Sequence, residues 1–156
     1  MELIRLEANS GPVFQRVLQW SYDWWGKDCQ GGIEEVMSTI GHSVNTDRLP
    51  QTFVAMDEGV PVGMYQLSMS DDLKGRPDIY PWLINVYVDE KHRGRNICRF
   101  MMETVKENAR KAGISRLYLY THHVGLYEKF GWSFLEFVDT FKGGEKERLY
   151  VLDVLR

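Results

Sequence analysis

"VYVDEKHRGRNICRFMM", residues 86–102, decides the predicted fold, because the end of a strand, a cationic turn and a helix face follow one another here. Val86 and Val88 are typical strand residues. A glycine at a strand-to-helix turn exposes backbone N–H groups, and a helix N-terminus carries about half a positive charge. The segment therefore predicts a phosphate-binding turn, and a solvated basic turn is the alternative that composition leaves open. The cations that gather around Gly94 are Lys91, His92, Arg93, Arg95 and Arg99.

The segment after this turn has the clearest helical periodicity in the chain. Its apolar face is followed by Gly113, which is typical of a helix end. The segment before it, "YPWLINVYV", is apolar almost throughout, as expected of a central strand. The small and apolar positions of the helix face are Ile97, Phe100, Met101, Thr104, Val105, Asn108, Ala109 and Ala112.

The remaining patterns predict an α+β chain in the order β-α-α-β-β-β-α-β-α-β-β. Pro12 suits a first helical turn capped by Asn9 or Ser10, a second helix runs from about 33 to 40, and "VGLYEKF" is a short fourth helix. "QTFVAMD" and "VPVGMYQLSM" predict a hairpin around Glu58-Gly59. We expect one domain over 1–156, with a mixed, mostly antiparallel sheet of about six to seven strands and about four flanking helices. The other predicted strands are "ELIRLE", "RLYLY", "WSFLEFV" and "RLYVLDVL".

Composition disfavours several classes of protein. The 19 basic and 22 acidic side chains give a formal charge of −3, whereas duplex-binding proteins usually carry a basic surplus. We find neither a signal peptide nor an apolar run near the roughly 20 residues that span a bilayer, so we expect a cytoplasmic protein without nucleic-acid or membrane partners. Cys29 and Cys98 lie far apart, and we expect no metal site.

Two motifs resemble the GNAT superfamily of acetyl-CoA-dependent N-acetyltransferases. "V-D-E-K-H-R-G-R-N-I-C" resembles its acetyl-CoA loop, Q/R-x-x-G-x-G/A, with Lys91 in place of Gln/Arg and Asn96 in place of the second glycine or alanine. "GLYEKFGW" resembles its second hallmark, a helix that carries a tyrosine before Gly-Phe or Gly-Trp. The element order also matches, so the resemblance covers essentially the whole chain and implies a GNAT-like fold and an acyltransferase.

The resemblance implies a cofactor site for acetyl-CoA. The backbone of Val86, Tyr87 and Val88 should contact the pantetheine arm, and residues 93–99 should hold the pyrophosphate. A bulge in the central strand should open a slot for the cofactor. Asn tolerates unusual backbone angles, so we expect binding to survive the change at Asn96. The implied pyrophosphate residues are Arg93, Gly94, Arg95, Asn96, Ile97, Cys98 and Arg99.

The resemblance also implies that Tyr127 is a general acid for the departing thiolate, because a phenol with an ordinary pKa near 10 keeps its proton at neutral pH. Packing between a helix and the sheet is the structural alternative. Many relatives carry a glutamate on the central strand as a base, but "PWLINVYV" has none and Asn85 cannot deprotonate an amine. His122 or His123 could serve, the latter facing Tyr127 if the turn between them is helical. A water chain is the other route.

The acetyl acceptor is predicted to be a small-molecule amine. Trp24, Trp25 and Asp28 could cage an alkyl-ammonium, and Asp71, Asp72 and Asp78 could extend an acidic mouth. Core tryptophans and loop aspartates are the alternative. A protein N-terminal or lysine acetyltransferase and a non-catalytic acyl-CoA sensor remain open functions. The chain could be a monomer or a homodimer.

Overall fold

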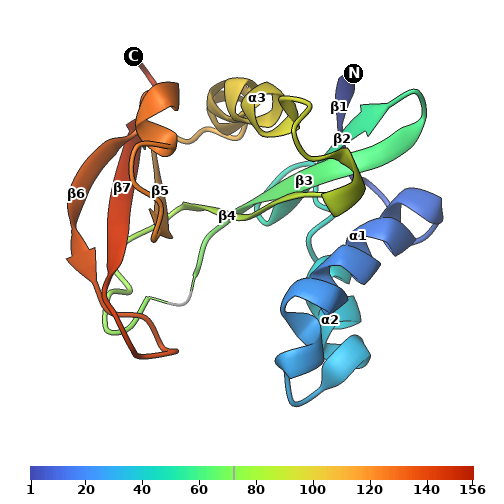
Figure 1. Ribbon diagram of the computed structural model, residues 1–156, viewed down its shortest axis with the longest axis horizontal. Helices are drawn as coiled ribbons and strands as arrows, with labels where there is room; N and C mark the ends of the chain where they lie inside the picture. Colours follow the sequence, from blue (N-terminus) through green and yellow to red (C-terminus); the bar gives the residue numbers. More distant parts are fainter. Residues whose placement is uncertain (72) are drawn as a thin grey trace. The chain divides into compact units, whose positions relative to one another are not determined.

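The computed structural model describes residues 1–71 and 73–156 (Figure 1). The strands and helices follow one another in the predicted order, with the turn η3 at the place of the predicted fourth helix. The long helix α3 follows the cationic turn. The helices are α1 (Pro12–Trp24), α2 (Gly32–Gly41) and α3 (Ile97–Lys111), with short 3₁₀ turns η1 (Gly26–Asp28), η2 (Glu90–His92) and η3 (Tyr127–Phe130). The strands are β1 (Glu2–Arg5), β2 (Gln51–Asp57), β3 (Val60–Ser68), β4 (Trp82–Val88), β5 (Arg116–Thr121), β6 (Ser133–Val138) and β7 (Glu147–Asp153).

The strands form a seven-stranded sheet in the order β1-β2-β3-β4-β5-β7-β6. β4 pairs with β5 in parallel, whereas β1–β2, β5–β7 and β6–β7 are antiparallel. The predicted mixed, mostly antiparallel sheet is therefore confirmed. The predicted fourth helix is the single 3₁₀ turn η3, so the described residues contain three α-helices instead of about four. Its C-cap is Gly131 at φ 91°, which ends the turn after one winding.

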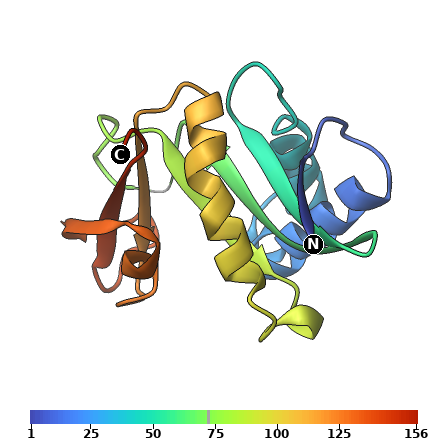
Figure 2. The ribbon, with the colours of Figure 1, turned by 90° about the horizontal axis from the view of Figure 1, so that it is seen from above.

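The chain forms two compact units, which we describe separately: residues 1–66 with 85–101, and residues 67–84 with 102–156. Unit 1, the first of these, contains the whole cationic turn. Its strands β1, β2 and β3 run side by side (Figure 2). Glu58 and Gly59 join β2 to β3 in the predicted hairpin, and their φ angles of 49° and 79° are typical of a type I′ turn.

Helices α1 and α2 of unit 1 pack side by side against one face of its strands (Figure 1). Pro12 occupies the first turn of α1 as predicted, and one face of the helix is buried. The cap was predicted wrongly: Gly11, at φ 95°, is the N-cap, and no side chain caps the helix. The buried core against this face comprises Leu6, Phe14, Val17, Leu18, Trp20, Val36, Ile40, Val54, Met56 and Met64.

The opposite face of β3 lies against the start of α3. A Cβ added to Gly63 would lie 3.0 Å from the Tyr87 carbonyl oxygen and 3.2 Å from side-chain carbons of Ile97 and Met101. Only a residue without a side chain therefore fits easily where β3, β4 and α3 approach one another. Unit 1 thus has helices on both faces of its strands, as the sequence predicts.

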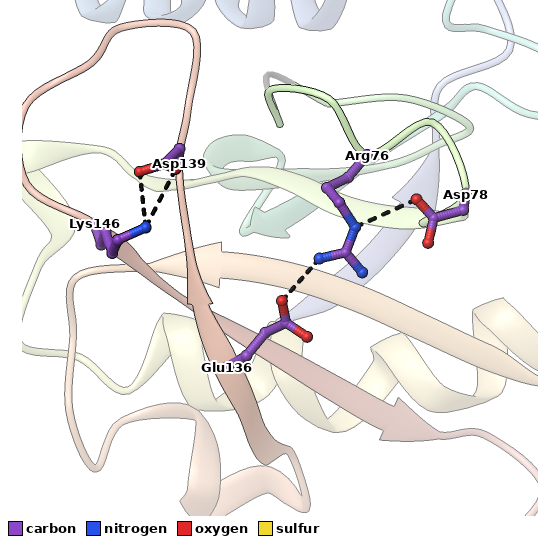
Figure 3. Close-up of polar contacts among 5 residues, drawn as sticks. All are labelled: Arg76, Asp78, Glu136, Asp139 and Lys146. Carbon is purple, nitrogen blue, oxygen red and sulfur yellow. Dashed lines mark hydrogen bonds and ion pairs between the residues drawn. The ribbon is translucent and has the colours of Figure 1, made fainter.

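Unit 2 joins β5, β7 and β6 to the connection between β3 and β4. A core of Leu73, Ile79, Trp82, Val138 and Leu149 lies beneath them. Arg76 ties this connection to the edge strand: its Nη1 lies 2.8 Å from Glu136 and its Nε 3.3 Å from Asp78 (Figure 3). Lys146 pairs with Asp139 at 3.1 Å across the β6–β7 turn. The connection is therefore held by ion pairs on its outer side and by apolar packing beneath.

We expect Arg76→Gln to loosen residues 73–79 while the protein stays folded, because exposed ion pairs contribute little to global stability. Hydrogen bonding from Arg76 lowers the pKa of Asp78 below its ordinary 3.8. The stabilisation of this carboxylate is thus present at neutral pH and is lost as the pH falls below about 3.8. Hydrogen exchange of the Lys74 amide, which donates to the Asp139 carbonyl at 3.1 Å, should accelerate in the variant at pH 7. Arg48→Gln is the control, because it removes an exposed ion pair of the other unit, between Arg48 and Asp47. The Lys74 amide of this variant should exchange at the wild-type rate.

Candidate functional site

The turn between β4 and α3 contains two residues with left-handed backbone. Gly94 has φ 82° and Asn96 has φ 60°, so they flank Arg95 just before the helix. The backbone N–H groups at the start of the helix have no partner within the helix and are the donors that an anion could use. Asn96 keeps the left-handed backbone at the position where the resemblance expects glycine or alanine. Its carbonyl accepts the first helical hydrogen bond of α3, from Phe100, at 3.0 Å.

The arginines of this turn have different neighbours. Arg93 donates from Nε to the Val88 carbonyl at 3.1 Å and lies over the Tyr87 ring at 5.7 Å. Its two Nη groups are left as the donors best placed for phosphate oxygens. Arg95 instead forms an ion pair with Asp57 at the end of β2. Arg99 is exposed on the first turn of α3. Arg93 is thus the stronger candidate for a phosphate contact, and Arg95 has a second role in anchoring the turn.

Cys98 is half-buried in the first turn of α3. Burial raises the pKa of its thiol, which keeps the thiol protonated and makes it a poor nucleophile. Ile97, its neighbour, is buried in the core. Both residues therefore support the turn by packing.

Trp24 and Trp25 do not form a cage. Trp24 is 47% exposed and its ring lies 5.4 Å from that of Tyr87, whereas Trp25 packs against the apolar core of unit 1. Tyr87 also contacts Trp20, at 5.6 Å, and burial raises the pKa of its hydroxyl, with Arg93 opposing that effect. Exposed Trp24 and half-buried Tyr87 therefore form an aromatic surface in unit 1. Trp25 is the C-cap of α1 and packs against the core, so it is not available to an acceptor as the sequence predicts.

The predicted acidic residues belong to different units of the chain. Asp28 is exposed in η1. Asp78 belongs to unit 2, where Arg76 holds it, so it contributes less negative charge than the sequence suggests (Figure 3). Asp72 lies outside the described residues.

Tyr127 begins η3 in unit 2 and is buried, with its ring 6.2 Å from that of Trp132 and 6.4 Å from that of Tyr150. The preceding turn is closed by Glu128, whose Oε2 accepts from the Gly125 amide at 2.7 Å. Desolvation opposes ionisation of this carboxyl, but hydrogen bonds from Tyr150 and Gly125 outweigh it and lower the pKa of Glu128. The backbone that carries Tyr127 is therefore fixed on both sides.

His123 does not lie on a helical face with Tyr127. η3 begins at Tyr127 itself, and residues 122–126 are not helical, so the condition for that arrangement is not met. Both histidines are exposed, with their rings 4.3 Å apart. The His123 amide donates to Thr121 Oγ1 at 3.1 Å, and its carbonyl accepts from Tyr150 at 3.4 Å. The backbone of His123, not its imidazole, supports the turn before Tyr127.

Sequence reasoning missed the polar residues inside unit 1. Asn85 has φ 52° within β4, an unusual backbone angle for a strand residue. Its amide nitrogen donates to Gln66 Oε1 at 2.6 Å, and Gln66 is itself buried. The signal was present as single polar residues in apolar strands, but the sequence does not say which of them pair.

The family of the chain follows from comparison with known proteins. The sequence profile of the acetyltransferase (GNAT) family matches residues 14–132, which include both motifs. The chain belongs to the acetyltransferase (GNAT) family. It is accordingly an acyltransferase by family, and its fold class is the predicted one.

Solved structures share this fold over almost their whole length. An aminoglycoside 6′-N-acetyltransferase complexed with coenzyme A superposes with a TM-score of 0.73 and 15% identity, covering 100% of this chain and 98% of that one. A GNAT family acetyltransferase from Elizabethkingia anophelis with acetyl-CoA bound gives 0.65 and 14%, covering 97% of each chain. The ribosomal-protein-S18-alanine N-acetyltransferase from Escherichia coli gives 0.62 and 14%, covering 98% and 94%. None of the curated proteins compared with the sequence matches it significantly.

Two further findings concern the described residues alone. Within 1–71 and 73–156, no group of three or more His, Cys, Asp or Glu side chains could hold a metal ion. In the same ranges, each helix is too short or too polar to cross a bilayer.

Proposed function

We propose that this protein transfers the acetyl group of acetyl-CoA to the primary amine of a small molecule. The observation that carries the proposal is the turn after β4, where left-handed Gly94 and Asn96 and the guanidinium of Arg93, whose Nε donates to Val88, precede the start of α3. Backbone amides at a helix N-terminus and an arginine together form a donor set suited to a diphosphate. Family membership and the coenzyme A bound to similar structures support the same cofactor.

In this proposal Val86, Tyr87 and Val88 offer backbone groups to the pantetheine arm, and the turn from Arg93 to Arg99 holds the phosphates. Acetyl-CoA supplies an activated thioester, whose carbonyl carbon the neutral amine attacks. Tyr127 gives its hydroxyl proton to the departing sulfur, so that free coenzyme A leaves as a thiol. The proton that the amine loses passes to water, since His123 does not share a helical face with Tyr127, and the Tyr127 oxygen takes a proton back from water before the next turnover.

A small-molecule acceptor is favoured over a peptide by the compact aromatic surface of Trp24 and Tyr87. An exposed indole beside a second ring can bind one ammonium group by cation–π contact. The resemblance to aminoglycoside acetyltransferases makes amino sugars the first acceptors to examine. Thiol release should be screened with aminoglycosides, alkyl polyamines, and peptides with free N-termini or lysines. Turnover on peptides alone would favour the protein acetyltransferase, and tight acetyl-CoA binding without release would favour the sensor.

We expect Trp24→Ala to raise KM for a cationic acceptor by about 2- to 5-fold, the worth of one exposed cation–π contact. The affinity for acetyl-CoA should change little, because Trp24 contacts the ring of Tyr87, whereas the proposed cofactor contact of Tyr87 is made by its backbone. Asp28→Asn should raise KM for cationic acceptors only, and an equal rise for neutral ones would indicate a structural role. Ile33→Ala, which truncates another exposed apolar residue of unit 1, provides the control.

A further inference from the structure

A chain of hydrogen bonds between side chains crosses three strands of unit 1. Asn85 on β4 donates to Gln66 on β3 at 2.6 Å, and Gln66 Nε2 donates to Thr52 Oγ1 on β2 at 2.9 Å. Thr52 Oγ1 donates in turn to the Ser43 carbonyl at 2.8 Å, in the segment that follows α2. Thr52 and Gln66 are 0% and 2% exposed, so neither can exchange these partners for water.

The polarity of this chain is fixed at its far end. A backbone carbonyl can only accept, so the single hydroxyl proton of Thr52 is committed to Ser43 and its oxygen must accept from Gln66. Gln66 therefore presents Nε2 to Thr52 and Oε1 to Asn85. Asn85 must then present its NH₂ group to Gln66, which leaves Oδ1 as its outward-facing hydrogen-bond acceptor. Reversing any member would leave a buried polar group unpaired, which is unfavourable.

The hydrogen bond to Gln66 places the Asn85 side chain beside the strand face that α1 and α2 cover. Tyr87 follows this asparagine by two residues, and Tyr87 contacts Trp20 and Trp24 of α1. Gln66 follows Met64 by two residues, and Met64 belongs to the core beneath α1 and α2. Asn85 is half-buried, and Oδ1 accepts no hydrogen bond from any residue that the structure describes. The Oδ1 atom of Asn85 is therefore an oriented hydrogen-bond acceptor beside Gln66, in the strand that leads to the cationic turn.

We propose that Asn85 Oδ1 binds an N–H of the acceptor amine and that Gln66 and Thr52 are positioning residues for it. This inference rests on the proposed function. A neutral amide oxygen orients the nitrogen without the large rise in ammonium pKa that a carboxylate would cause. The amine then loses its proton to water near its own pKa and attacks with its lone pair unshared.

The test compares variants on the best amine of the thiol-release panel, or on kanamycin if several amines tie. Asn85→Gly removes the amide without strain, because φ 52° suits glycine. We expect kcat/KM for the amine to fall about 10-fold, the range of one well-formed hydrogen bond, with the Kd of acetyl-CoA unchanged. Thr52→Val frees Gln66 to reorient and should reproduce a smaller part of the same loss. Asn85→Asp should move the acidic limb of the kcat/KM profile to higher pH, since a carboxylate raises the pKa of an amine beside it.

Val54→Ala is the matched control for Thr52→Val. Val54 is buried on the same strand and outside the hydrogen-bond chain, so its truncation lowers stability without altering kcat/KM for the amine. The inference is overturned if Asn85→Gly keeps the wild-type kcat/KM, or if the acidic limb of the kcat/KM profile of Asn85→Asp lies at the wild-type pH. Neither result would contradict the proposed acetyl transfer. Absence of thiol release by the wild type with every amine overturns the proposed function and this inference with it.

Discussion

Tyr127→Phe should lower the turnover number by roughly 10²–10³ while leaving the protein folded and the Kd of acetyl-CoA unchanged. The substitution removes one oxygen and keeps the ring that packs against Trp132 and Tyr150. Loss of one hydroxyl hydrogen bond costs about 0.5–1.5 kcal/mol of stability, too little to unfold a typical domain. Without the phenol the departing thiolate has no positioned acid, and the chemical step slows. Single-turnover kinetics at neutral pH measure this step directly.

The pH dependence separates this role from packing. A thiolate can leave unprotonated near its own pKa, so the defect should shrink as the pH rises toward about 9. Tyr118→Phe is the matched control, because Tyr118 is another tyrosine of unit 2, packed against Trp82 instead. It should turn over at the wild-type rate. Wild-type turnover by Tyr127→Phe at neutral pH would assign Tyr127 to the core alone, as would a defect that is constant with pH.

Gly94→Glu should abolish measurable acetyl-CoA binding, and Arg93→Ala should weaken it by about 10- to 150-fold. At Gly94, φ 82° disfavours any side chain, and a carboxylate there also repels the phosphates. Open space surrounds the position, so the substitution disturbs the turn without a steric clash in the core. Arg93→Ala removes one charge-assisted contact and the cation–π contact to Tyr87. Isothermal titration calorimetry at two salt concentrations measures both effects.

Arg48→Ala controls for the loss of a positive charge, since Arg48 is exposed in unit 1 and pairs only with its neighbour Asp47 among the described contacts. It should bind acetyl-CoA as the wild type does. The salt dependence should be strong for the wild type and weaker for Arg93→Ala, because one fewer cation meets the phosphates. If Gly94→Glu and Arg93→Ala both bind acetyl-CoA with the wild-type affinity, the cationic turn is only a solvated surface.

The sequence predicted the fold where local chemistry and periodicity agree. The apolar spacing of residues 97–112 predicted α3, and Glu58-Gly59 predicted the hairpin whose positive φ angles the structure contains. The fourth helix was predicted too long, because helical spacing in "VGLYEKF" does not reveal that Gly125 and Gly131 both take left-handed backbone and limit it to one turn. Element type was therefore more predictable than element length.

The candidate site was less predictable, because side-chain partners far apart in sequence decide it. Trp24 and Trp25 look alike in the sequence, yet one is exposed against Tyr87 and the other packs in the core, since the helix ends between them. Arg95 is separated from Asp57 by 38 residues, and no local pattern indicates that they pair. The chain from Asn85 to Ser43 likewise depends on the register of three strands.

The central claim is that this protein moves an acetyl group from acetyl-CoA to an amine, and transfer of an isotopically labelled acetyl group tests it most directly. The protein is incubated with acetyl-CoA carrying ¹³C in the acetyl group and with the amine panel, and the products are analysed by mass spectrometry. We predict the label on one amine of an acceptor, with one equivalent of free coenzyme A thiol for each acetyl group transferred, and loss of this product in Tyr127→Phe at neutral pH. Binding of acetyl-CoA with the label remaining on the thioester in every reaction would contradict the account.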